Sequence, residues 1–395
     1  MVKHSVVWLI ALLALVACTP RPTHPPHPSS RSGQNGTVTT LETINSYGED
    51  AARLLIQNHG GPFKDETVEA YLQAVVRSLA TANGNPPGNP SRGWQVWVVN
   101  NPACELLSVP GGTLLVYRGF LDRVSSQREL AAVLGHEMAH LTLDHLAQTA
   151  SGDHAVVDSQ SLADFIVHYR YGVEQERQAG DLWRQQVGTA GHADVLTEGL
   201  CRGGWIDRHP NGIDGVFPEL QLPAEVPAAP SFDDMHTVLA TLSPGYALFE
   251  QGLQLERQEH FLKAIAVYLQ AATQAPDQSQ ILTGLGLAYL KVGERNSARH
   301  HLQRAVRLDG GYYRSHLGLG YVSLQLGDLE RAEKELRESL ALLPTVQGRY
   351  LLADVYRSQG DWRRAAPLFR QVMDAEPHST LGKAARQAID EQPRP

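Results

Sequence analysis

The sequence predicts an α+β domain, mostly helical with a small β-sheet, followed by an all-helical domain built from repeats. Residues 41–222 mix helix-type and strand-type hydrophobic patterns, whereas residues 244–392 are helical throughout and carry small residues in phase. Between them, residues 223–243 open with a stretch rich in Pro and Ala and predict a linker. A chain of 395 residues is long enough for two or three such domains.

The first residues predict export and lipid attachment. Residues 1–17 combine a short polar start with an apolar run too short to span a bilayer, as in a signal peptide. The run ends in Leu15-Val16-Ala17-Cys18, which resembles the lipobox of bacterial lipoproteins, so we expect cleavage before Cys18 and lipidation of this cysteine. Thr19 follows instead of Asp, which favours the periplasmic side of the outer membrane. The alternative is an ordinary signal peptide, and in either case residues 18–40 read as a flexible Pro/Ser-rich tether.

The net charge bears on the class of binding partner, and the cysteines bear on a possible disulfide bond. A formal net charge of -8 without a long basic run argues against nucleic-acid binding. Besides Cys18, the chain contains Cys104 and Cys201, and an exported chain meets an oxidising compartment where they can pair. Whether they do stays open, because the sequence does not give the distance between their Cα atoms.

The helical half contains four repeats. Gly252, Gly286, Gly320 and Ala353 follow one another at intervals of 34, 34 and 33 residues, and Ala occurs twelve residues after each. Small residues at these places allow two helices to cross closely. The pattern resembles the tetratricopeptide repeat and implies a solenoid, with a capping helix near residues 381–389, whose concave face binds peptides or proteins.

The stretch His136-Glu137-Met138-Ala139-His140 carries the chemistry of the first half. Ser126 and Glu129 form a capping-box pattern that predicts the start of a helix through this HExxH sequence. Residues four apart lie on one face of a helix, so both imidazoles can bind one zinc ion while Glu137 acts as general base. Gly135 is unfavourable in a helix interior, and we expect another backbone to approach it closely.

A third zinc ligand is expected in the next helical stretch, where Glu174 and Glu176 are candidates. Glu176 shares the apolar face with Val173, Trp183 and Gly180, whereas Glu174 lies on the polar face. Because a ligand must point into a buried site, helical phase favours Glu176.

Alternating patterns predict strands at residues 95–99, 106–109 and 113–117, the last two joined by Pro110-Gly111-Gly112. One of these strands is a candidate edge for binding substrate as an added strand, and a hairpin without a substrate role is the alternative.

Five segments together resemble metallopeptidase family forty-eight, a family of HExxH zinc peptidases. They are Val109-Pro110-Gly111-Gly112, Tyr117-Arg118-Gly119, residues 129–140, Glu174-Gln175-Glu176-Arg177 and His209-Pro210. The resemblance covers residues 41–222 and implies a zincin-type fold, one zinc ion per chain and ligands His136, His140 and Glu176. It also implies that His209 lies at the active site, where it can cap the zinc and keep the enzyme latent, and that His145 has a structural or supporting role.

The chain departs from the family at three positions. Gly180 replaces an Asp that supports a ligand His, Glu105 replaces an Asn, and Gly215 replaces an Arg. By analogy with other zinc sites, a lost supporting group weakens zinc binding by about 10–100-fold.

The sequence therefore predicts a zinc endopeptidase of the bacterial envelope. By analogy, its substrates would be unfolded or misassembled envelope proteins, with the repeats binding substrate or an outer-membrane assembly machine. The departures favour an alternative, a lipid-anchored scaffold or chaperone with a degenerate or latent peptidase domain. No apolar run is long enough to favour a membrane-embedded protease.

Overall fold

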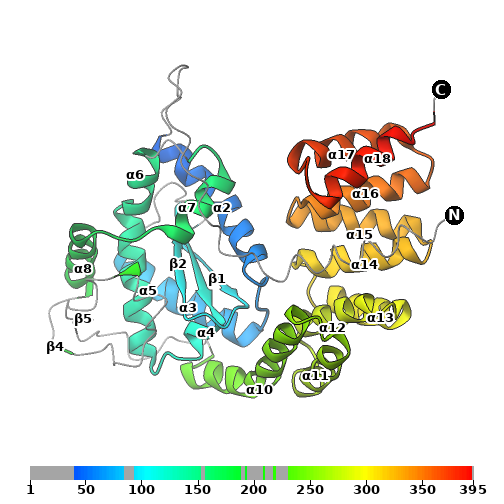
Figure 1. Ribbon diagram of the computed structural model, residues 1–395. Coiled ribbons are helices and arrows are strands. Elements are labelled where there is room, and N and C mark those ends of the chain that lie inside the picture. Colours follow the sequence, from blue (N-terminus) through cyan, green and yellow to red (C-terminus); the bar gives the residue numbers. More distant parts are fainter. Residues whose placement is uncertain are drawn as a thin grey trace. The chain divides into compact units, whose positions relative to one another are not determined.

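The computed structural model describes residues 40–83, 93–152, 156–187, 192–193, 208–209, 217–218 and 230–393. This part of the chain forms two compact units, whose boundary in the sequence lies between Thr241 and Leu242 (Figure 1). Among the described helices, none combines the length and apolar character needed to cross a bilayer.

A three-stranded sheet lies at the centre of the first unit. Its strands are β1 (Gln95–Val99), β2 (Leu106–Val109) and β3 (Thr113–Tyr117), in the order β1-β3-β2. Strands β2 and β3 pair antiparallel, and β1 pairs parallel to β3. The hairpin between β2 and β3 turns at Gly111 and Gly112, whose φ angles of 87° and 90° favour glycine. The strand segments are as predicted, and the hairpin is one edge of a mixed sheet.

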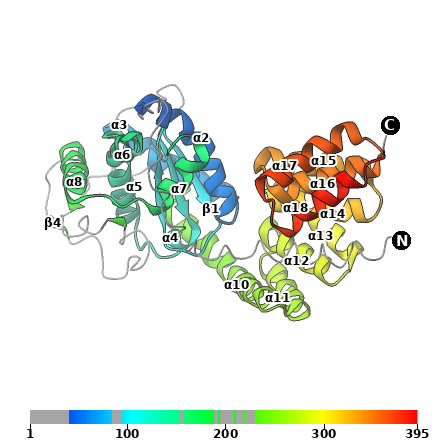
Figure 2. The same cartoon turned by 45° about the horizontal axis from the view of Figure 1, so that its top comes forward.

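Helices cover this sheet (Figure 2). Apolar side chains of β2 and β3 share a core cluster with α2 (Leu41–Asn58), α6 (His145–Gly152) and α7 (Ser159–His168). Helix α3 (Glu66–Asn83) contacts β1, and α5 (Gln127–Thr142) contacts β2. The remaining elements of the unit are α4 (Arg118–Leu121), α8 (Val173–Val187), and the short paired strands β4 (His192–Ala193) and β5 (Phe217–Pro218).

Helix α5 begins where the capping pattern predicts. The Ser126 hydroxyl accepts a hydrogen bond from the Glu129 backbone N–H at 3.1 Å. The Glu129 carboxylate accepts from the backbone and hydroxyl of Ser125, one residue earlier than a capping box requires. Every residue from Glu129 to Leu141 is buried, so the HExxH segment lies within the domain core.

The expected linker is partly helical. Residues 223–229 lie outside the described part of the chain, but α10 (Phe232–Arg257) begins inside the segment that we assigned to the linker and continues into the first repeat. The Ser231 hydroxyl accepts from the Asp234 N–H at 3.1 Å, and the Asp234 carboxylate accepts from the Ser231 N–H at 2.8 Å. This reciprocal cap starts a helix where composition alone suggested a loop.

The second unit is an all-helical solenoid, as the repeat pattern predicts. The periodic small residues lie where helices meet: a Cβ on Gly252, Gly286 or Gly320 would come within 2.2, 2.6 and 2.6 Å of Tyr268, Leu302 and Leu336. Only glycine permits such close contacts. The helices are α11 (Phe261–Gln274), α12 (Ser279–Lys291), α13 (Arg295–Leu308), α14 (Tyr313–Gln325), α15 (Leu329–Leu342), α16 (Val346–Ser358), α17 (Trp362–Ala375) and the final α18 (Thr380–Asp390).

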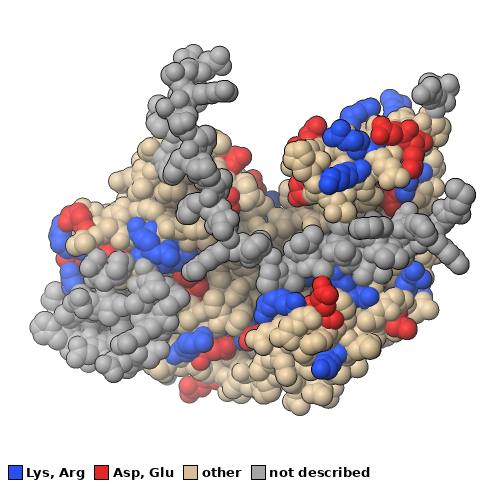
Figure 3. Space-filling model, in the orientation of Figure 1, with Lys and Arg blue, Asp and Glu red and all other residues tan. Residues whose placement is uncertain are grey.

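Charged side chains are mixed on the surface. On the face drawn in Figure 3, Lys and Arg alternate with Asp and Glu over both units. Neither sign of charge dominates the described part of this face.

Candidate metal centre

The HExxH helix α5 supplies two imidazoles. His136 and His140 lie one turn apart, and their Nε2 atoms are 3.0 Å from each other. Both side chains are buried. Burial lowers the pKa of His140 to about 3, although the nearby Glu176 carboxylate opposes this shift. His140 is therefore neutral at physiological pH, the form in which an imidazole binds a metal.

Helix α8 supplies a carboxylate to the same place. Glu176 Oε2 lies 3.1 Å from His136 Nε2 and 3.7 Å from His140 Nε2. Glu174 is exposed and forms an ion pair with Arg177, as helical phase predicts. Val173, which we placed on the buried face, is instead 66% exposed. It is the first residue of α8, and the buried face begins only at Glu176.

A tryptophan explains the glycine in α5. A Cβ on Gly135 would lie 2.2–2.6 Å from three carbons of the Trp183 ring, so the close neighbour is an indole and not the backbone that we expected. Trp183 is two turns after Glu176 on α8 and is buried. Its ring lies against α5 at Gly135, and this contact sets how closely α8, which carries Glu176, approaches α5.

The donor set fits zinc. His136, His140, Glu176 and His209 each place a ligand atom within 4.8 Å of the others, and all four side chains are buried. Zinc–ligand bonds of 2.0–2.1 Å in a tetrahedron separate ligand atoms by about 3.3 Å. The separations of 3.0, 3.1 and 3.7 Å among the first three residues bracket this value. One carboxylate together with imidazoles is a set of ligands typical of catalytic zinc.

Glu137 lies beside this cluster. Its Oε2 accepts a hydrogen bond from the hydroxyl of Ser108 on β2, and its Oε1 lies 2.9 Å from His209 Nε2. Burial raises the pKa of the Glu137 carboxyl, but the charge of His209 and its hydrogen bond to Glu137 outweigh burial and lower the pKa to about 2. Glu137 is therefore ionised and able to accept a proton.

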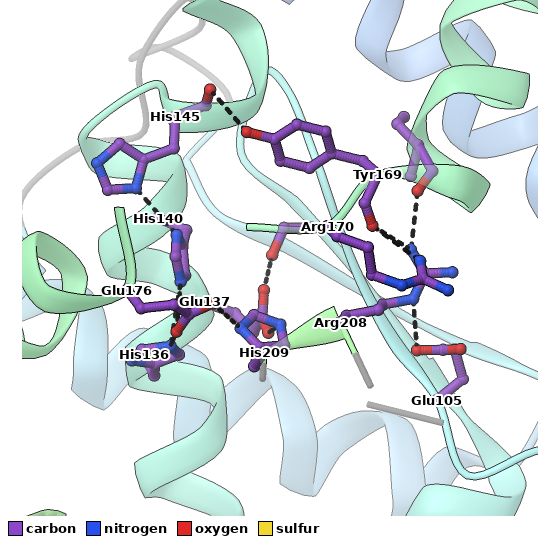
Figure 4. Close-up of polar contacts among 12 residues, drawn as sticks. Glu105, His136, Glu137, His140, His145, Tyr169, Arg170, Glu176, Arg208 and His209 are labelled. Carbon is purple, nitrogen blue, oxygen red and sulfur yellow. Dashed lines mark hydrogen bonds and ion pairs between the residues drawn. The ribbon is translucent and has the colours of Figure 1, made fainter. Parts of the chain in front are cut away.

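His209 reaches the cluster from a segment far along the chain (Figure 4). Its two ring nitrogens lie 2.9 Å from Glu137 Oε1 and 2.9 Å from Glu176 Oε1. Burial opposes protonation, but the two carboxylates outweigh burial and raise the pKa of His209 to about 9. His209 thus bridges Glu137 and Glu176.

Arg208 fixes the backbone beside His209. Its guanidinium donates to the carbonyls of Ile166 and Val167, both at 2.8 Å, and to Glu105 Oε1 at 2.8 Å. Glu105 is one of the departures from the family, and it has the charge that Arg208 requires. This ion pair had no signal in the sequence, because its members are 103 residues apart.

Three further residues near His140 were also missed or left without a defined role. His145 Nδ1 lies 2.9 Å from His140 Nδ1, and His145 Nε2 lies 3.0 Å from Gln178 Oε1. The Tyr171 ring packs on His140 with centroids 3.7 Å apart. Nothing in the periodicity or motifs points to Gln178 or Tyr171.

The other sequence-based expectations have mixed outcomes. A Cβ on Gly180 would meet only the Arg184 guanidinium, at 3.8 Å, so the place of the family Asp is open. Cys104 is disulfide-bonded, but Cys201, the partner that we considered, lies outside the described residues. Cys18 and Gly215 also lie outside them.

Comparison with known families agrees with this geometry. Residues 66–196 match Peptidase family M48, and residues 283–346 and 349–381 match tetratricopeptide repeats. Residues 66–196 thus resemble the M48 metallopeptidases. In this chain the region that matches M48 is followed by the regions that match the repeats, as the sequence predicted.

The curated relatives of the M48 domain are metalloendopeptidases. The chain is 36% identical over 80 residues to "Metalloendopeptidase OMA1, mitochondrial" of Bos taurus, covering 20% of this chain and 15% of the relative. It is 35% identical over 115 residues to "Mitochondrial metalloendopeptidase OMA1" of Schizosaccharomyces pombe, covering 29% of this chain and 30% of the relative. The chain thus spans less than a third of the length of these relatives. The crystal structure of MamA protein covers 38% of this chain and 84% of its own, with 21% identity and a TM-score of 0.33.

Proposed function

We propose that this chain is a zinc-dependent endopeptidase that cleaves unfolded or misassembled proteins of the bacterial cell envelope. The observation that carries the proposal is the convergence of His136, His140 and Glu176 from two helices, with the ionised Glu137 beside them. The match of residues 66–196 to M48 peptidases supports the same activity.

Glu137, Ser108 and His209 have different roles in the proposed hydrolysis. A bound zinc ion would supply a Lewis acid that polarises the scissile carbonyl and acidifies water. Glu137 accepts the proton of the attacking water and then passes it to the leaving amine. Ser108 holds one carboxylate oxygen of Glu137 and leaves the other for this transfer. His209 must first move away, because it lies 2.9 Å from that second oxygen.

Strand β2 is the expected binding edge for substrate. It is an outer strand of the sheet, and its Ser108 contacts Glu137. The opposite outer strand, β1, forms a bridge with Pro62. An extended substrate that added to β2 would therefore lie beside the general base.

Location and partner recognition complete the proposal. The lipobox-like sequence ending in Cys18 supports a lipid anchor in the outer membrane, facing the periplasm. The repeats would bind either the substrate or an outer-membrane assembly machine, since stacked helix pairs present an extended concave surface.

Removing the metal tests the activity directly. We expect the purified full chain to digest casein, a zinc chelator to abolish digestion, and stoichiometric zinc to restore it, since His136, His140 and Glu176 would bind the metal that activates water. Cleavage that persists after metal analysis shows complete removal of zinc would contradict the proposal.

The second candidate function is a latent or degenerate peptidase that serves as a lipid-anchored scaffold or chaperone. The position of His209 between Glu137 and Glu176 favours latency. If the open state is a minor tenth of the population, His209→Ala raises casein hydrolysis by about tenfold. His168→Ala is a matched control, because His168 is exposed at the end of α7.

Hydrolysis rates of both variants against wild type distinguish the two candidates. Unchanged or lower activity in His209→Ala would show that His209 does not block the site. Bound zinc with no hydrolysis in any variant would favour the scaffold.

A further inference from the structure

A line of hydrogen bonds leads from the exposed side of α8 to the buried ring of His140. It passes through Glu174, Gln178 and His145 by contacts of 2.9, 3.0 and 2.9 Å. Figure 4 shows its inner end, where the rings of His145 and His140 meet. The donor of each hydrogen bond is determined by the bond before it. All the hydrogen bonds in the line therefore donate toward Glu174.

The direction begins at Glu174. An ionised carboxylate only accepts hydrogen bonds, and Glu174 already accepts two from Arg177, at 2.6 and 2.9 Å. Gln178 must therefore present its amide nitrogen to Glu174, as the 2.9 Å contact from Nε2 to Oε1 shows. Its carbonyl oxygen then faces His145, and this oxygen is an acceptor only.

The tautomer of His145 follows from that orientation. Its Nε2 must carry a proton in order to donate to Gln178 Oε1. In a neutral ring the proton on Nε2 leaves Nδ1 with a lone pair, so Nδ1 accepts from His140 Nδ1. The opposite arrangement would leave two lone pairs facing each other between Gln178 and His145.

We propose that Glu174, Gln178 and His145 are positioning residues that hold His140 in its Nδ1–H tautomer, with the Nε2 lone pair directed at the metal. That Nε2 is the atom 3.0 Å from His136 Nε2 and 3.7 Å from Glu176 Oε2. This chain of hydrogen bonds from Glu174 to His140, called the relay below, rests on the proposed zinc site. It gives the exposed Glu174 and Gln178 a role in zinc affinity that neither burial nor ligand geometry assigns to them.

Zinc affinity, measured by competition with a chromogenic chelator on the full chain, tests the relay. Supporting groups of metal-binding His residues affect affinity by about 10–100-fold. We expect His145→Phe to raise the dissociation constant into this range and Gln178→Leu to raise it by about tenfold. Gln178→Glu keeps an acceptor toward His145 but loses the donor toward Glu174, so its dissociation constant should lie between those of wild type and Gln178→Leu. Gln185→Leu, the same change at an exposed position on α8, should have no effect.

Gln178 is exposed, so Gln178→Leu is expected to fold even if His145→Phe does not, and zinc affinity can still be measured. Nitrogen-15 NMR of the zinc-free chain supplies the second measurement, with His145 protonated at Nε2 and His140 at Nδ1. Wild-type affinity in Gln178→Leu, or a proton on His145 Nδ1, would overturn the relay. Zinc affinity and casein hydrolysis are measured separately. If the variants change zinc affinity as expected but the wild-type chain does not hydrolyse casein, only the proposed function is contradicted.

Discussion

Replacing Glu137 with Gln is expected to lower casein hydrolysis by about 10³-fold while zinc remains bound. Gln has the same shape and can still accept from Ser108, which contacts this side chain from β2. An amide, however, cannot take the proton of the attacking water. The ligand atoms of His136, His140 and Glu176 are untouched, so the loss falls on the chemical step.

Single-turnover hydrolysis and zinc content, measured on the same preparation, separate the two effects. Glu66→Gln on α3 is the matched control, because it makes the same change at an exposed carboxylate outside the site. Glu137 would not be the general base if Glu137→Gln retained activity with its zinc, and loss of zinc would assign it a structural role.

Replacing Gly135 with Ala is expected to destabilise the first unit by about 2–3 kcal/mol and to weaken zinc binding. The added methyl would lie 2.2 Å from a carbon of Trp183. The indole is 1% exposed and has no space to retreat, so α8 must shift away from α5. Glu176 lies on the same face of α8 and would withdraw from His136.

Gly180→Ala provides a control of opposite sign. This glycine also lies in the interior of a helix, but its Cβ would meet only the Arg184 guanidinium at 3.8 Å. Helix propensity then favours Ala by about 0.5–1 kcal/mol. Thermal unfolding with zinc titration measures both variants, and Gly135→Ala combined with Trp183→Leu should recover part of the loss. Equal destabilisation by the two Gly→Ala changes would refute the packing explanation.

Local signals in the sequence were sufficient for much of the site. The i, i+4 spacing of His136 and His140 and the capping Ser126 lie within one helix, and helical phase selected Glu176 over Glu174. Likewise, the repeats follow from a period that recurs along the chain. Such features depend on neighbours that are close in the sequence, and periodicity reveals them.

Contacts between distant segments had no such signal. Arg208 and Glu105 are 103 residues apart, and Gln178 and His145 are 33 apart. Each pair depends on how two elements pack and not on the pattern within either one. The indole over Gly135 belongs to the same class: the sequence indicated a close neighbour, but only packing shows that it is a side chain. The start of α10 inside the assigned linker had a local signal, because the capping residues Ser231 and Asp234 stand in the sequence, but composition was given more weight.

The unbroken burial of α5 limits how the proposed peptidase can diversify. From Glu129 to Leu141, no residue faces solvent, and each is constrained by metal chemistry or by the core. Most substitutions in this stretch would lower the stability of the fold or disrupt the metal site. Few neutral substitutions are therefore available there to change substrate specificity. New specificities must instead arise from β2, from the exposed side of α8 or from the repeats, where changes leave the catalytic helix intact.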